Sequence, residues 1–409
     1  MTNRVFSFFS SLRLTVVLLG LALLLVFIGT LAQVKLGLYV AQTEYFRSIF
    51  VYWQPTGANW KIPVFPGGWL IGGLLLVNLI SAHVKRFKLT KKKIGIFLIH
   101  GGLILLLLGQ FFTELFQVES NIRLEEGETR NYSEDSRLTE LAFIDTSHPD
   151  HDEVTAVSEE LLARGGEIRS PKLPFTIRVK DYFPNSTNAG PNSDGGKKIS
   201  AQTQSGEKVW FSNEPLVATM DMRNVPSVLL EIDSGKSGPI ERIASLWMNG
   251  SQPIVVDGRI YQMILRPTRY YMPFTLTLLD FRHDLYQGTS TPKNFSSKIH
   301  LNDPKRGEDR DVLIKMNDPL RHAGLTFFQA SFDKFNDKVT ILQVVRNPAA
   351  ITPYLACILV GLGLLTQFLM HLVSFGKKSR GKKQVEPFRQ PSPKARPAVV
   401  ATSDERRTL

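Results

Sequence analysis

His100 is an ionisable, metal-binding side chain in a segment that is otherwise largely apolar from Ile94 to Phe116. The segment is long enough for a helix that spans a bilayer, which needs about 20 residues. At about 1.5 Å per residue, His100 would lie roughly 9 Å from the start of that helix. Polar groups at membrane depth are costly, and imidazole is a common axial ligand of haem iron. We therefore consider His100 a candidate haem ligand.

Two further histidines, His83 and His371, close other apolar segments on the same side of the predicted membrane region. One histidine supplies one axial ligand, whereas two give a six-coordinate haem of the electron-carrier type. The second ligand is either His83, His371 or a histidine of a partner, and the sequence leaves this open. Each residue also has a structural interpretation: His83 and His371 as interfacial anchors, and His100 as a helix–helix contact beside Gly101.

The remaining five histidines lie between the third and fourth apolar segments: His148, His151, His283, His300 and His322. The spacing of His148 and His151 could hold a metal ion. With no cysteine or further histidine nearby, a solvated polar loop is the favoured interpretation.

Four apolar segments have the length of membrane spans: about 12–33, 67–84, 94–116 and 351–375. The formal net charge is +12, and much of the positive charge flanks these segments, at 4–13, 85–93 and 377–383. This is the positive-inside pattern. It predicts a multi-pass protein of the cytoplasmic (plasma) membrane, with both termini in the cytoplasm, in contact with the lipid bilayer. It explains the basic character without nucleic-acid binding.

The segment 117–350 has the alternating pattern of β-strands, as in 175–180 and 274–279, separated by turn signals such as Asp257-Gly258. The stretch from Leu173 to Phe183 is similar to that from Met272 to Arg282, which indicates either a duplicated β unit or simply a proline before each strand. A sandwich or open barrel is expected. The loop 188–198 is predicted to be mobile.

The predicted fold class is a polytopic α-helical membrane protein with four transmembrane helices and a large β-rich extracytoplasmic domain between spans three and four. The expected organisation is an N-terminal membrane region, 1–116, the β-rich domain, 117–350, the fourth span, 351–375, and a basic disordered cytoplasmic tail, 376–409.

The chain has one cysteine, Cys357, within the last apolar segment. It can form no internal disulfide and has no Cys-x-x-Cys pair, which excludes thiol–disulfide exchange as its own chemistry. Cys357 is expected to be a small buried apolar residue.

Three features together resemble the ResB/CcsB family of cytochrome c biogenesis proteins. The first is the layout of three spans, a large β-rich domain and one span. The second is the His100 span, 97–110, followed by Leu-Glu-Glu-Gly-Glu at 124–128. The third is the block 317–332, which is similar to the family's Asn-x-Pro-Leu…Gly…Phe-x-Gln-x-Ser. In this chain the family's Phe aligns with either Phe327 or Phe328. Gln329 directly follows Phe328, and one residue separates it from Phe327.

The resemblance implies a membrane subunit of a system II cytochrome c synthase, acting with a CcsA/ResC-type membrane subunit. Together they would deliver haem across the membrane and attach it to apocytochrome c at Cys-x-x-Cys-His. The resemblance also implies that His100 is an axial ligand of a transient haem b shared with the partner, which would supply the second ligand. Thiol-disulfide reductant proteins would be further partners. The five tryptophans are scattered, so the chain lacks a tryptophan-rich haem-handling segment and would be a non-autonomous subunit of a holocytochrome c synthase (haem lyase).

Two other classes of function remain open. One is a haem-free membrane scaffold that docks apocytochrome or redox partners, with His100 only packing between helices. The other is a b-type electron carrier with two internal histidine ligands. Such carriers usually place ligand pairs at two depths, and this sequence offers one.

Overall fold

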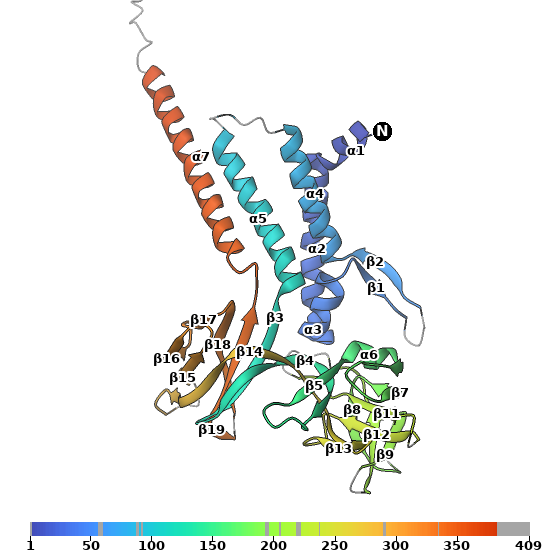
Figure 1. Ribbon diagram of the computed structural model, residues 1–409. Coiled ribbons are helices and arrows are strands. Elements are labelled where there is room, and N and C mark those ends of the chain that lie inside the picture. Colours follow the sequence, from blue (N-terminus) through green and yellow to red (C-terminus); the bar gives the residue numbers. More distant parts are fainter. Residues whose placement is uncertain are drawn as a thin grey trace, which may run out of the picture.

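The computed structural model describes residues 2–55, 60–86, 90, 93–192, 196–203, 206–217, 222–236, 238–288, 292–333 and 335–382. Its long helices run side by side on one side of the molecule, and a β-rich domain lies at one end of them (Figure 1). The parts of the predicted mobile loop and of the predicted tail at 193–195 and 383–409 lie outside the described residues.

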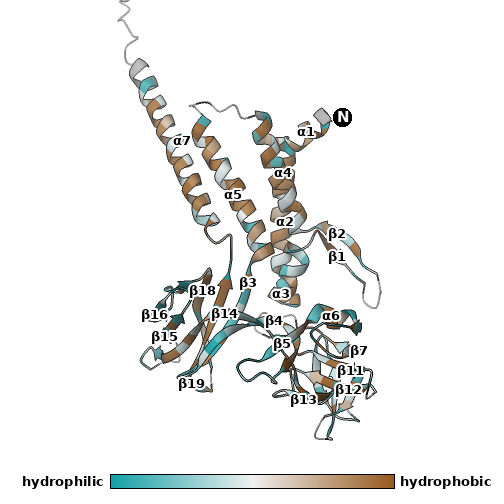
Figure 2. Ribbon diagram, viewed as in Figure 1, coloured by the Kyte–Doolittle hydropathy of each residue, from teal (hydrophilic) through white to brown (hydrophobic). Residues whose placement is uncertain are grey.

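Among the described residues, four helices are long and apolar enough to cross a membrane, which confirms that expectation. Figure 2 shows hydrophobic residues over most of their length. They are α2 (Leu12–Leu36), α4 (Gly68–Arg86), α5 (Ile94–Phe116) and α7 (Thr352–Lys382); shorter helices are α1 (Thr2–Phe9), α3 (Leu38–Ala41) and the π-helix η1 (Gln42–Phe46).

The fourth long helix differs in two ways from the sequence interpretation. It continues to Lys382, beyond residue 375, because the lysines and arginines that follow are good helix formers. Cys357 is exposed, so its predicted burial is wrong. Its neighbour Ala356 is the residue that faces α5, and the next position of a helix points about 100° away.

Helix α5 packs against α7 through three glycines seven residues apart, Gly95, Gly102 and Gly109, which are the buried residues of α5. A Cβ atom added to Gly102 would lie 2.7 Å from Val360 Cγ2 and 2.8 Å from the carbonyl oxygen of Ala356. Small residues allow helix backbones in a membrane to approach closely. The glycine stripe therefore fixes which face of α5 meets α7.

A two-stranded hairpin joins the first two long helices (Figure 1). It consists of β1 (Phe50–Trp53) and β2 (Ile62–Pro66), paired antiparallel. Val51 is buried against Leu25 of α2 and Ile71 of α4. Tyr52 and Trp53 are exposed, as expected for aromatic side chains near a membrane–water interface.

The β-rich domain is built around one large antiparallel sheet. Its strand order is β16-β15-β14-β4-β3-β19-β18-β17, with β13 on β14 and β5 on β4. The bounds are β3 (Val118–Glu125), β4 (Thr129–Asp145), β5 (Glu153–Ser158), β13 (Gln252–Val256), β14 (Arg259–Leu285), β15 (Pro292–Asp303), β16 (Glu308–Lys315), β17 (Leu320–His322), β18 (Leu325–Asp333) and β19 (Asn336–Arg346).

Two smaller sheets complete the domain. One has the order β12-β11-β7-β6 and the other β8-β10-β9. Their bounds are β6 (Gly166–Ile168), β7 (Thr176–Phe183), β8 (Ser186–Ala189), β9 (Lys198–Gln202), β10 (Lys208–Asn213), β11 (Ser227–Asp233) and β12 (Ile240–Ser245). The short helix α6 (Glu159–Arg164) precedes β6, and Gly165 follows it with a φ of 70°.

Two hydrophobic cores lie at opposite ends of the long strand β14. Phe175 belongs to one core and Phe274 to the other, and each begins a run of alternately buried residues. The two similar segments noted in the sequence therefore contribute buried residues to different cores. Because β14 contributes to both cores and pairs with β4 along much of its length, the two halves form one continuous structure (Figure 1).

Short connections hold the β-rich domain against the helices. Only Gln117 separates α5 from β3, and 347–351 separate β19 from α7. The Asn347 side chain donates hydrogen bonds of 3.2 Å to Thr113 Oγ1 and to Gln117 Oε1. The two chain crossings are thereby tied to each other, which fixes the domain at the ends of α5 and α7.

Candidate functional site

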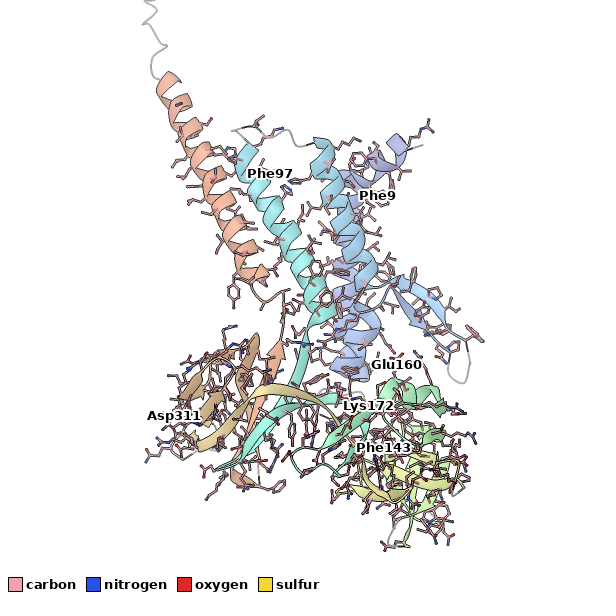
Figure 3. All side chains as sticks on the ribbon, in the orientation of Figure 1. Phe9, Phe97, Phe143, Glu160, Lys172 and Asp311 are labelled. Atoms are coloured by element: carbon pink, nitrogen blue, oxygen red, sulfur yellow. The ribbon has the colours of Figure 1, made fainter. Side chains whose placement is uncertain are left out.

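The structure brings together two of the three predicted site histidines. The ring centroids of His83, on α4, and His100, on α5, lie 5.1 Å apart with the ring planes tilted by 57°. Phe97 lies one turn before His100 and 5.6 Å from the His83 ring. Figure 3 shows Phe97 in the first turns of α5, at the end of the helices distant from the β-rich domain.

A hydrogen bond within α5 sets the orientation and the tautomer of His100. Its Nδ1 lies 2.9 Å from the carbonyl oxygen of Ile96. A carbonyl can only accept, so Nδ1 carries the proton and, in the neutral ring, Nε2 carries the lone pair. Metal-binding histidines commonly donate their second nitrogen to a backbone carbonyl in this way. The local geometry of His100 is therefore that of an Nε2 ligand.

The glycine stripe places His100 on the side of α5 away from α7. His100 and Gly102 are two positions apart, about 200° around a helix. Since Gly102 faces α7, His100 faces the opposite side, where α4 lies. The rotation of α5 about its axis thus explains why His83 of α4 contacts His100.

The third predicted site residue, His371, is not part of this pair. It is exposed on α7, and its Nε2 lies 2.9 Å from Nε2 of Gln367 on the same helix. Gln367 packs at the level of Gly95, near the start of α5. His371 is one turn farther on, so it lies about 13 Å along the helix axis from the level of His100.

The residues present fit one axial ligand of haem. His100 offers an oriented Nε2, and His83 and Phe97 supply ring surface beside it. A centroid separation of 5.1 Å is that of two aromatic rings in contact, so a macrocycle between His83 and His100 would require them to separate. This geometry favours a second ligand from outside the chain.

The block 317–332 contains a second arrangement of polar side chains, which the sequence interpretation missed. His322, on β17, donates from Nε2 to Oδ2 of Asp303 at 2.9 Å, and Arg306 Nη1 lies 3.0 Å from the same oxygen. The Asp303 side chain is completely buried. Burial alone would raise the pKa of Asp303, but the hydrogen bonds from His322 and Arg306 lower it below its ordinary value.

The other histidines of the β-rich domain have structural contacts. His300 lies 3.0 Å from both Asp309 and Asp311, and His283 stacks on Phe295. The exposed rings of His148 and His151 stack on each other. Within the described ranges, no group of three or more histidine, cysteine or acidic side chains could hold a metal ion.

Comparison with known proteins gives a family and a relative. Residues 249–341 match the ResB-like family. Protein NrfI of Wolinella succinogenes is 26% identical over 306 residues, which are 73% of this chain and 29% of NrfI. The chain therefore spans less than a third of the length of this relative.

A solved structure described as cytochrome c haem lyase CcmF also matches, with 11% identity over 73% of this chain and 30% of that one. The TM-score is 0.20, so no conclusion about architecture follows from it. The match of residues 249–341 to the ResB-like family and the similarity to NrfI confirm the resemblance noted in the sequence.

Proposed function

We propose that this chain is the membrane subunit of a system II cytochrome c synthase, in which His100 binds haem during its delivery to apocytochrome c. The observation that carries the proposal is the geometry of His100, whose Nδ1 donates to Ile96 and whose Nε2 has the lone pair. The match of residues 249–341 to the ResB-like family and the similarity to NrfI support a role in cytochrome c biogenesis.

The reaction requires a second subunit of the CcsA/ResC type. The contact between His83 and His100 leaves no space for haem between them, and we infer that the second axial ligand comes from the partner. His100 would hold the iron from this chain, and the haem would supply the vinyl groups to which the cysteine thiols of apocytochrome c add.

The β-rich domain is proposed to lie outside the cytoplasm. Basic residues lie at the end of the long helices that is distant from the β-rich domain. Lys85 is near the end of α4, Lys93 precedes α5, and Lys377 lies near the end of α7. Positive charge favours the cytoplasmic side. The His83–His100 pair then lies toward the cytoplasm, where newly made haem enters.

The β-rich domain is proposed to hold apocytochrome c by adding an extended segment to a sheet edge. Strands β16 and β12 end the strand orders of two sheets. Backbone groups at a sheet edge can pair with an extended peptide. Crosslinking of apocytochrome to the complex should fail when 118–346 are deleted; crosslinking that persists would contradict this role.

The proposed function is tested by measuring matured cytochrome c in cells that express the chain with its partner. We expect His100→Ala to abolish covalent haem staining of the cytochrome, while His371→Ala, at the other side of α5, leaves it near the wild-type level. Membrane levels of each variant are compared by immunoblotting. Normal staining with His100→Ala at a normal protein level would contradict the proposal.

A further inference from the structure

We propose that two adjoining cavities around the β17–β18 turn form a binding site for an amphipathic anion, with Arg321 and Arg346 as the anion-binding residues. The site lies at the junction of the β-rich domain with α5 and α7. It goes beyond the proposed function because it does not involve His100.

The larger cavity opens where the β-rich domain meets the long helices. Its volume is ≈ 640 Å³. Thr113 of α5 and Tyr354 of α7 line one side, and Arg321 and Phe328 line the other. Because these helix ends belong to membrane-spanning segments, the cavity is reached from the level of the lipid headgroups. An amphipathic ligand could enter it directly from the bilayer.

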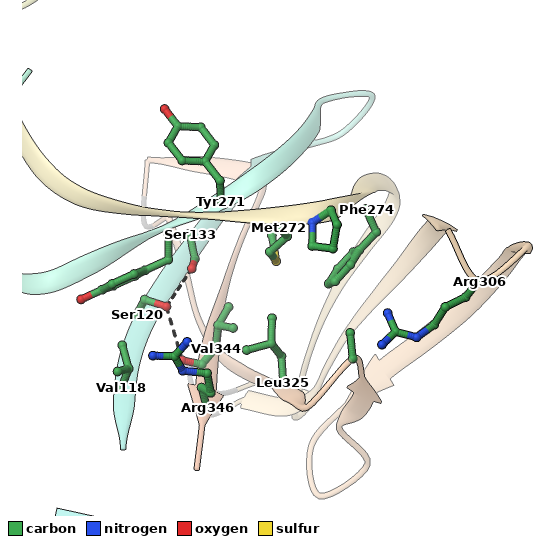
Figure 4. Close-up of a pocket in the computed structure, with 13 residues that line it drawn as sticks. Val118, Ser120, Ser133, Tyr271, Met272, Phe274, Arg306, Leu325, Val344 and Arg346 are labelled. Atoms are coloured by element: carbon green, nitrogen blue, oxygen red, sulfur yellow. Dashed lines mark hydrogen bonds between the residues drawn. The ribbon is translucent and has the colours of Figure 1, made fainter. Parts of the chain in front are cut away.

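The smaller cavity continues behind the turn, into the β-rich domain, and has a volume of ≈ 280 Å³. Ala323 and Leu325 line both cavities, so the two adjoin at the β17–β18 turn. Figure 4 shows apolar side chains, among them Met272 and Phe274, between Arg346 and Arg306. The cavity is therefore apolar in the middle and cationic at its edges.

All the charged residues that line the two cavities, apart from His322, are arginines: Arg306, Arg321 and Arg346. Arg306 is paired with the buried Asp303. In the described part of the chain, the ion pairs include neither Arg321 nor Arg346. Both are exposed, and Arg321 has only a 3.4 Å hydrogen bond to Thr326. Two arginines are thus available for an anion.

The turn between the cavities is held in an unfavourable backbone conformation. Ala323 has a φ of 52° and Gly324 a φ of 78°. The left-handed region is costly for a residue with a Cβ, and such strain persists only where the surroundings impose it. The adjacent His322 is fixed by its buried hydrogen bond to Asp303. The buried pair therefore holds the Ala323 backbone at the wall of both cavities.

The chemistry of this lining selects a ligand with a carboxylate or phosphate group and an apolar body. Arginine binds both anions through paired hydrogen bonds. The apolar body would lie against Leu325, Phe328 and Met272. Two sources supply such a molecule at a membrane surface: an anionic phospholipid and the carboxylates of a porphyrin.

The test uses the full chain in nanodiscs, in a His100→Ala background so that the membrane histidine contributes no binding. Zinc protoporphyrin IX is titrated by fluorescence, with its dimethyl ester as the uncharged control. Retention of phosphatidylglycerol against phosphatidylcholine is measured by native mass spectrometry. The variants are Arg321→Gln with Arg346→Gln, and as a matched control Arg310→Gln, an exposed arginine of β16 that pairs with Glu308.

We expect the double variant to weaken binding of at least one charged probe by about tenfold or more, the loss expected for charge-assisted hydrogen bonds. Arg310→Gln should bind both charged probes as wild type does. The dimethyl ester should bind the double variant and wild type equally. Loss of phosphatidylglycerol alone identifies a lipid site, and loss of zinc protoporphyrin alone identifies a porphyrin site. Unchanged binding of both probes in the double variant, with an unchanged unfolding temperature, would overturn the proposal.

Discussion

The rings of His83 and His100 are in contact, with centroids 5.1 Å apart, although one lies near the end of α4 and the other near the start of α5. The contact places an oriented imidazole beside a second ring at one end of the long helices. Because the two rings touch, no space for a haem remains between the two histidines. The proposed haem site is therefore built from one residue of this chain and completed by the partner.

Replacing His83 tests whether this chain supplies both ligands. We expect His83→Ala to retain a haem b spectrum in the purified complex with the partner, because His83 contacts His100 and does not bind iron in our account. The spectrum is compared at equal protein concentration. Disappearance of the haem from a correctly assembled His83→Ala complex would instead make the chain a bis-histidine haem protein.

The α5–α7 interface offers a matched pair of adjacent glycines. A Cβ at Gly102 meets α7 within 2.7 Å, whereas a Cβ at Gly101 meets nothing within 4 Å. We expect Gly102→Ala to destabilise the protein by about 1–3 kcal/mol through overpacking. Gly101→Ala should be neutral. Thermal unfolding in detergent, followed by far-UV circular dichroism, measures the difference. Equal unfolding midpoints for Gly102→Ala and Gly101→Ala would contradict close packing of α7 against Gly102.

The β-rich domain contains a buried ion pair. Arg266 Nε lies 2.9 Å from Glu140 Oε1, with side chains only 5% and 9% exposed. We expect Glu140→Gln to cost about 3–5 kcal/mol, because it leaves a buried guanidinium without its counter-charge. Asp280→Asn, at the exposed pair with Arg282, should cost under about 1 kcal/mol. Urea unfolding, followed by tryptophan fluorescence, compares the stabilities of the two variants. Similar losses of stability would contradict the burial of the Arg266–Glu140 pair.

The Asp303–His322 pair predicts a dependence of stability on pH. The pKa of Asp303 is lowered in the folded protein, despite its burial, by hydrogen bonds from His322 and Arg306, and Glu308 lies near the other side of His322. The ionised carboxylate therefore stabilises the fold above the ordinary aspartate pKa of 3.8 and ceases to do so as pH falls through the lowered value.

We expect Asp303→Asn to be less stable than wild type at neutral pH and the difference to shrink below pH 3.8. Urea midpoints measured across this range report the change. Asp280→Asn, at the exposed ion pair with Arg282, is the control. A difference between wild type and Asp303→Asn that stays constant with pH would exclude a stabilising charge on Asp303.

The membrane helices and the alternating strands could be predicted from the sequence because each depends on a local pattern. A run of apolar residues marks α5, and alternation marks Phe274, Leu276 and Leu278 as buried. The seven-residue spacing of Gly95, Gly102 and Gly109 was also present in the sequence and would have predicted the face of α5 that meets α7.

The contacts between distant residues could not be predicted in this way. Whether His83 or His371 reaches His100 depends on the rotation of three helices about their axes, which hydropathy does not determine. The pairing of Asp303 with His322 depends on the path of the chain between β15 and β17. The sequence therefore identified the candidate ligand but not its neighbours.

The most direct test of the account is a reduced optical spectrum of the purified complex with its partner, comparing wild type with His100→Ala. We expect a haem b spectrum in wild type, its loss in His100→Ala, and its recovery when imidazole is added to replace the missing ligand. An unchanged spectrum in His100→Ala would contradict the account, because both axial ligands would then belong to the partner and this chain would be a scaffold for apocytochrome c.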